Sequence, residues 1–191
     1  MIALSLAELA LLAIAAYQDI KTREIDMYLI ILIFIPSLFS FYLYYKIPLY
    51  FLSPLLGAIL ALVMRLTGSG YADSLVLLAI SFFPPPVPFM PTPAVVVAGS
   101  SAPALATTLW LALRNRGMPC ELSLLQRLTH VCASREEVLK HPHRYIIGDV
   151  KDLEHYTPPE VKEEYVVARY GVPYVAYLAV GFSLYVLLSF L

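Results

Sequence analysis

Charged residues are scarce in this chain. Of its 191 residues, 14% are charged, whereas soluble globular proteins have about 25%. This scarcity argues against a soluble globular protein. The formal net charge is −1, so the bulk charge predicts neither a nucleic acid nor any other strongly acidic or basic partner.

Cysteine and histidine are also few, and their spacing fits no redox or zinc motif. The two cysteines, Cys120 and Cys132, form no Cys-x-x-Cys pair, so neither a redox motif nor a zinc ribbon is indicated. A zinc site would need these cysteines together with His130, His141 and His143, of which only the last two are close in sequence. Structural zinc ligands usually come in pairs at short fixed spacing, so we predict no metal. The chain has no glycine-rich cofactor fingerprint either, and we predict no cofactor.

Long apolar runs are what the chain has in abundance, since 60% of its residues are hydrophobic. A helix needs about 20 mostly apolar residues to cross the hydrocarbon layer of a membrane. The first run has no basic start and no small-residue cleavage site, so it is not a cleavable signal peptide. We predict an all-α polytopic membrane protein, a bundle of six transmembrane helices at 2–17, 27–45, 48–66, 73 to about 89, 94–113 and 173–191.

The charges gather in one interval between the fifth and sixth runs. Residues 114–170 hold 9 of the 13 Lys and Arg, 9 of the 14 acids and all four His. We therefore predict three parts: 1–113 with five transmembrane helices, 114–170 as a small α or α+β cytoplasmic insertion of open role, and 171–191 with the sixth helix.

Local signals indicate some structure inside this insertion. Ser134 to Glu137 and Thr157 to Glu160 have the capping-box pattern that begins a helix. They predict one short helix that ends near Pro142 and a second that runs to Arg169. The run HRYIIGDV between them predicts a short strand.

The distribution of basic residues predicts the orientation of the chain. Lys and Arg collect in cytoplasmic loops. With six spans, the connections 18–26, 67–72 and 114–170 lie on one side, and together with Arg65 they hold 12 of the 13 basic residues. These connections are predicted to be cytoplasmic, and both termini are predicted to lie outside the cell.

Two aspartates then fall at one depth, although they are far apart in sequence. Asp19 ends the first span, and Asp73 begins the fourth, both at the cytoplasmic end. An ionisable residue in a spanning segment is a functional hypothesis by default. Two simpler interpretations stay open: Asp19 also fits a helix end among headgroups beside Lys21 and Arg23, and Asp73 also fits a helix N-terminus after the Gly70 turn.

The pair suggests a specific chemistry. Two neighbouring carboxylates do not both ionise easily, so one acts as a base on water while the other, protonated, polarises a carbonyl. That division of roles is aspartyl peptide hydrolysis. Glu8 shares a helix face with Asp19, three turns away, and one interpretation places it in a cavity with the aspartates. The alternative is a protonated glutamic acid that bonds to a neighbouring helix.

Two short motifs resemble those of the archaeal prepilin and preflagellin peptidases, a GxGD aspartyl protease family. Gly70-Tyr71-Ala72-Asp73 resembles the GxGD motif, and DIKTREI from Asp19 resembles the first-aspartate motif. Six spans in about 200 residues also match the family. The resemblance implies that Asp19 and Asp73 are the catalytic pair and that Gly70, with Tyr71 and Ala72, lets the loop approach the site.

The resemblance further implies an activity. The enzyme would remove short basic leader peptides from type IV pilin-like or archaellin precursors at the cytoplasmic face of the cell membrane, in an archaeal source. Bacterial relatives carry cysteine pairs and also methylate the product; this chain has no such pairs, so peptidase activity alone is expected. Asp26, where many relatives have proline or serine, departs from the pattern.

Two other functions compete with this one. An intramembrane protease like presenilin or signal peptide peptidase also uses a GxGD-type aspartate, and its PAL tripeptide occurs at Pro103–Leu105. The predicted topology places that tripeptide in the outer half of the fifth span, away from the aspartates. A small transporter would use Glu8, Asp19 and Asp73 as an ion or proton path, but transporters often show internal repeats, and the sequence shows none.

Overall fold

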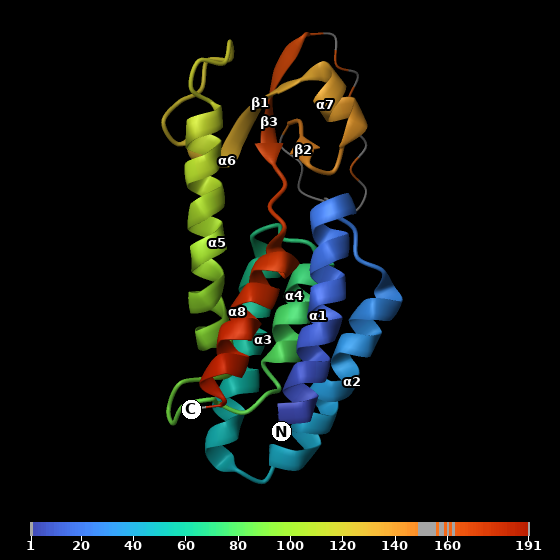
Figure 1. The fold of residues 1–191 in the computed structure, drawn as a ribbon, viewed down its shortest axis with the longest axis vertical. Helices are drawn as coiled ribbons and strands as arrows, with labels where there is room; N and C mark the ends of the chain where they lie inside the picture. Colours follow the sequence, from blue (N-terminus) through green and yellow to red (C-terminus); the bar gives the residue numbers. More distant parts are fainter. Residues whose placement is uncertain (1, 149–155, 157–158, 160, 162, 191) are drawn as a thin grey trace. The chain divides into compact units, whose positions relative to one another are not determined.

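A computed structural model describes residues 2–148, 156, 159, 161 and 163–190 of the chain. The described part is mostly helical and contains one small antiparallel sheet (Figure 1). The chain divides into two compact units, one made of 1–102 and 173–191 and the other of 103–172.

The first unit is built from apolar helices. These are α1 (Ile2–Thr22), α2 (Met27–Tyr44), a 3₁₀ turn (Pro48–Phe51) that leads into α3 (Leu52–Leu66), α4 (Tyr71–Ile80), the start of α5 (Thr92–Arg114), and α8 (Tyr174–Leu188). In the described residues, four helical segments are long and apolar enough to cross a membrane: Ile2–Thr22, Met27–Tyr44, Pro48–Leu66 and Thr92–Arg114. They suggest a multi-pass membrane protein. Helices α4 and α8 are apolar but shorter.

Two of the predicted helix ends are wrong. Helix α1 continues through Thr22, so Asp19 lies inside its last turn and not beyond its end. Helix α4 ends at Ile80, well short of the predicted residue 89. The three prolines at 84–86 explain this end, because proline lacks an N–H donor and clashes with the preceding turn.

Hydrogen bonds from side chains hold the irregular segment that follows α4. The hydroxyl of Tyr50 donates a hydrogen bond to the carbonyl oxygen of Phe82 (2.5 Å), and the hydroxyl of Thr92 donates to that of Phe83 (2.8 Å). Helix α5 begins at Thr92, but the threonine hydroxyl bonds to the carbonyls of Phe83 and Pro84 and not to the helix amides as an N-cap would. Phe83 itself is fully buried. The proline-rich segment therefore closes one end of the helix bundle as ordered structure.

Helix packing brings three parts of the sequence together. Helix α1 packs against α8 and α2, and α4 packs against α3, α2 and α8 (Figure 1). The buried core includes Leu12, Leu77, Phe83, Leu178 and Phe182. Helices α5 and α8 approach closely at Gly181, where a Cβ atom would lie 2.0 Å from the carbonyl oxygen of Val96. Because of this packing, the C-terminal helix reaches the start of α4 and the end of α1.

The second unit contains the sheet. It consists of the end of α5, α6 (Gln126–Thr129), β1 (His130–Ser134), α7 (Arg135–Lys140), β2 (Tyr145–Ile146) and β3 (Tyr165–Tyr170). The strand order is β1-β3-β2, and both pairings are antiparallel, with His130 opposite Arg169. Val131, Ala133, Val138 and Ala168 form its buried core together with Leu111.

The predictions for this interval have mixed outcomes. The capping box at Ser134 is confirmed, since its hydroxyl accepts from the amide of Glu137 and its amide donates to the Glu137 carboxylate. The predicted strand is confirmed as the short β2. The predicted helix to Arg169 is wrong, because 165–170 form β3, where β-branched residues suit pairing with β1. Residues 157, 158 and 160 of its capping box lie outside the described residues.

A disulfide joins Cys120 to Cys132, with their Cα atoms 5.7 Å apart. It ties the segment after α5 to strand β1. The spacing of the two cysteines in sequence fits neither a redox motif nor a zinc ribbon and did not indicate this pairing.

Candidate functional site

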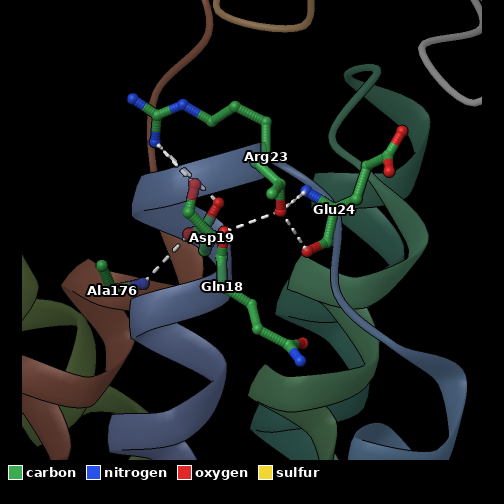
Figure 2. A network of polar contacts seen from close by, with 6 residues as sticks. Gln18, Asp19, Arg23, Glu24 and Ala176 are labelled. Carbon is green, nitrogen blue, oxygen red and sulfur yellow. Dashed lines mark hydrogen bonds and ion pairs between the residues drawn. The ribbon is translucent and has the colours of Figure 1, made fainter.

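Asp19 lies where α1 ends and α8 begins. The residue is 6% exposed, and its Oδ2 accepts a hydrogen bond from the amide of Ala176 at 3.1 Å (Figure 2). Ala176 belongs to the first turn of α8, whose first amides have no partner within the helix. Asp19 thus satisfies one of these amides and places its negative charge at the positive end of a helix dipole.

Arg23 covers the same carboxylate. Its Nη1 lies 3.9 Å from Oδ1 of Asp19 and donates to the Asp19 carbonyl oxygen at 3.3 Å. The two side chains are each only 8% exposed, so this is a buried ion pair. The backbone of Arg23 has φ 64°, a left-handed conformation that ends α1 and turns the chain toward α2. Figure 2 shows the guanidinium and Ala176 approaching Asp19 from different sides.

Asp73 lies in the first turn of α4, after a glycine turn. Gly68 has φ 85°, and Gly70 is the N-cap of the helix. The amide of Gly70 hydrogen-bonds to the Asp73 carboxylate, which is the return half of a capping box. A Cβ on Gly70 would lie 3.5 Å from Oδ2 of Asp73, an ordinary contact. The turn therefore presents the Asp73 side chain at the end of the helix, where it is half-buried.

The residues beside Asp73 fix the turn. The guanidinium of Arg65 lies 3.5 Å from the ring centroid of Tyr71, and its Nη1 donates to the carbonyl oxygen of Ser69 at 3.4 Å. Tyr71 is 50% exposed, and Ala72 is half-buried. Tyr71 carries the Arg65 guanidinium on its ring, and both residues belong to the first turn of α4, so they form part of the turn that presents Asp73.

The structure brings Asp19, Asp73 and Arg23 together. The charge of Asp19 acts on Asp73, and the charge of Arg23 acts on both carboxylates. The packing of α1 and α4 on the same helix, α8, accounts for this meeting of residues from distant parts of the sequence. Arg23 is the member that the sequence analysis missed as a site residue. Its position four residues after Asp19, one helical turn away, was the available signal.

Glu8 does not join this group. It is fully buried, and the Ser37 hydroxyl of α2 donates a hydrogen bond to its Oε1 at 3.2 Å. Its Oε2 has no hydrogen-bond partner among the described residues. Along α1, Glu8 and Asp19 are separated by about 16 Å at 1.5 Å per residue. This contact with α2 is the one expected of a protonated glutamic acid that bonds to a neighbouring helix.

Asp26 connects α1 to the start of α2. Its Oδ2 accepts from Nε2 of Gln18 at 2.7 Å, and its amide donates to Oε1 of the same glutamine at 3.1 Å. These two hydrogen bonds close the turn that contains Arg23. The residue that departs from the family pattern thus has a structural partner in this chain.

In this site, the Asp19 carboxylate has the Arg23 guanidinium and the Ala176 amide beside it. The Asp73 carboxylate shares these surroundings. Such a pair holds one proton more readily than none. In the described residues, no three His, Cys, Asp or Glu side chains form a group that would hold a metal ion. No protein family, no curated protein and no solved structure matches the chain. The functional argument rests on this geometry and on the two motifs.

Proposed function

We propose that the protein is a membrane-embedded aspartyl endopeptidase of the prepilin and preflagellin peptidase type, with Asp19 and Asp73 as its catalytic residues. Its substrates are precursors of type IV pilin-like or archaellin subunits, from which it removes a short basic leader. The supporting observation is that α1 and α4, which carry the two aspartates, both pack on α8, and that Asp19 and Asp73 lie within electrostatic reach of one another.

The reaction needs one water and two carboxyl groups with different protonation. The Asp19 carboxylate takes a proton from water while the water oxygen attacks the scissile carbonyl carbon, and the protonated Asp73 gives its proton to the carbonyl oxygen. The tetrahedral intermediate then collapses. Asp19 returns its proton to the leaving nitrogen as the C–N bond breaks, and Asp73 regains a proton from the gem-diol. Both groups finish in their starting states, and one peptide bond has been hydrolysed.

The proposed setting is the cytoplasmic face of the cell membrane, with six spans and both termini outside. The 12 basic residues on one side support this orientation. Helix α4 rises about 15 Å, half the hydrocarbon layer, so the buried segment around Phe83 completes this span inside the protein, as irregular backbone in a membrane requires. A pair at the membrane surface reaches the junction between a leader and its hydrophobic helix without unwinding that helix.

Thiol labelling tests this orientation. A membrane-impermeant reagent is expected to modify Lys46→Cys in intact cells and Lys21→Cys only after the cells are opened. The opposite pattern would place the aspartate pair on the outer face.

Cleavage of a precursor tests the activity. Detergent-solubilised protein is incubated with a leader-bearing pilin precursor, and the N-terminus of the product is sequenced. We expect Asp19→Asn and Asp73→Asn each to abolish cleavage with the helical content retained by circular dichroism. Glu24→Gln is the matched control, because it removes an exposed acid close to Asp19 and is expected to cleave normally. Full cleavage by either aspartate variant would refute the catalytic pair.

A further inference from the structure

We propose that Arg23 is a positioning residue that decides which aspartate is the base: it keeps Asp19 ionised and so leaves the shared proton on Asp73. This inference rests on the proposed function. The two motifs name the aspartates but assign them no protonation states, and the assignment comes from the contacts of Arg23 and α8 with Asp19.

The two carboxylates have unequal surroundings. Asp19 has the Arg23 guanidinium 3.9 Å from one oxygen and the Ala176 amide 3.1 Å from the other. Both contacts favour a negative charge and act against the cost of burying it. Asp73 receives the amide of Gly70 within its own turn and has no recorded ion pair among the described residues.

The cation of α3, Arg65, packs beside the start of α4, where it is engaged with the Tyr71 ring and the Ser69 carbonyl. Helices α2 and α8 contain no charged residue, and α4 contains only Asp73. Asp19, Asp73 and Arg23 are therefore the charged groups that act on one another, with the amides of Val175 and Ala176 contributed by α8. Removing the cation leaves two carboxylates whose competition for one proton is decided by amides alone.

The backbone of Arg23 supports a role for its side chain. Its φ of 64° belongs to the left-handed region, where glycine is the favoured residue. A glycine would make the same turn with less strain, yet it would provide no cation for Asp19. Arg23→Gly is consequently a substitution that removes the guanidinium while suiting the backbone.

The test is the pH dependence of kcat for precursor cleavage by the full-length protein in detergent, measured for wild type, Arg23→Gly, Arg23→Lys and Lys21→Gln. We expect the acidic limb of the Arg23→Gly profile to move to higher pH by about one unit, the size of effect that an opposite charge at this range has. KM is expected to stay within about twofold, because the guanidinium acts through Asp19. Arg23→Lys retains a cation and should keep the limb closer to wild type. Lys21→Gln removes an exposed charge two residues away and should leave the profile unchanged.

The outcomes separate the two proposals. An acidic limb that stays in place in Arg23→Gly, whether or not its rate falls, overturns the role of Arg23. The same result with Asp19→Asn and Asp73→Asn inactive leaves the peptidase proposal intact. Wild-type protein that cleaves no leader-bearing precursor, or aspartate variants that cleave normally, overturns the proposed function itself.

Discussion

Helix α1 buries a carboxyl group at two places along its length, and it does so in different ways. In its interior, Glu8 is fully buried against a neutral hydroxyl, that of Ser37 on α2. In its last turn, Asp19 has a guanidinium and a helix amide beside it and a second carboxylate nearby. Both acids belong to the same helix and the same face.

This difference teaches that burial alone does not make an acid functional. A carboxyl group with only a hydroxyl partner in an apolar bundle is stable when it carries its proton, and it then links two helices. A carboxylate with a cation and an amide is held in its ionised form, ready to accept a proton. The partners of Asp19 therefore distinguish it from Glu8 as the reactive group.

The largest expected effect concerns Asp19→Ala. The substitution removes the carboxylate that pairs with the buried Arg23 guanidinium, and breaking a buried ion pair in this way costs about 3–5 kcal/mol of stability. Thermal unfolding in detergent measures this loss. The double variant Asp19→Ala with Arg23→Gly is expected to recover much of it, because the cation is removed together with its partner. If the double variant is as unstable as the sum of its two single changes, the two residues do not form a coupled pair.

A smaller effect is expected at Glu8, in the interior of the helix. Ser37→Ala removes the recorded partner of Glu8 and should destabilise the protein by about 1–3 kcal/mol, the cost of a buried polar group left without its bond. Precursor cleavage should be unchanged once the variant is folded. Loss of cleavage equal to that of Asp19→Asn would connect Glu8 to the active site and contradict the contrast between the two acids.

The smallest effect is expected for an exposed pair in the second unit, Glu137 with Arg114. Burial acts to raise the pKa of Glu137, but the Ser134 amide and the Arg114 guanidinium outweigh it and hold the pKa below its usual value. A lowered pKa contributes stability that is full above the ordinary carboxyl pKa and is lost as the pH falls through the lowered one. Since the side chain is 42% exposed, we expect less than about 1 kcal/mol. Unfolding temperatures at neutral and acidic pH should differ less in Glu137→Gln than in wild type, and an unchanged difference would contradict this account.

The sequence predicts the helices well and their ends less well. Apolar runs determine where α1, α2, α3, α5 and α8 lie, because few other structures bury so long a run. Helix α4 ends early because the apolar composition continues into prolines that cannot extend it. Strand β3 replaces a predicted helix because pairing with β1, 30 or more residues away, outweighs the local capping signal.

The candidate site is predictable in part for a similar reason. Asp19 and Asp73 stand out because charges are rare in their helices, and topology brings their ends to one depth. Arg23 does not stand out, since basic residues are ordinary in a cytoplasmic connection. Its role depends on a buried contact and on a left-handed backbone, and neither is visible in the sequence.

The disulfide in the second unit challenges the predicted orientation. Disulfides persist mainly in oxidising compartments, although intracellular proteins of hyperthermophiles are an exception. Cys120 and Cys132 are bonded within an interval that holds 9 of the 13 basic residues and is predicted to be cytoplasmic. The thiol-labelling experiment decides between the two indications, and either result leaves the meeting of Asp19 and Asp73 unaltered.

The central claim is that Asp19 and Asp73 work as one unit and that Glu8 does not belong to it. The most direct measurement compares single-turnover cleavage of a leader-bearing precursor by Glu8→Gln, Asp19→Asn, Asp73→Asn and the double aspartate variant. The account predicts near-normal cleavage for Glu8→Gln and equal loss in the three aspartate variants, because residues that act together are not additive. Substantial cleavage by one single aspartate variant, or a loss in Glu8→Gln as large as in Asp19→Asn, would contradict it.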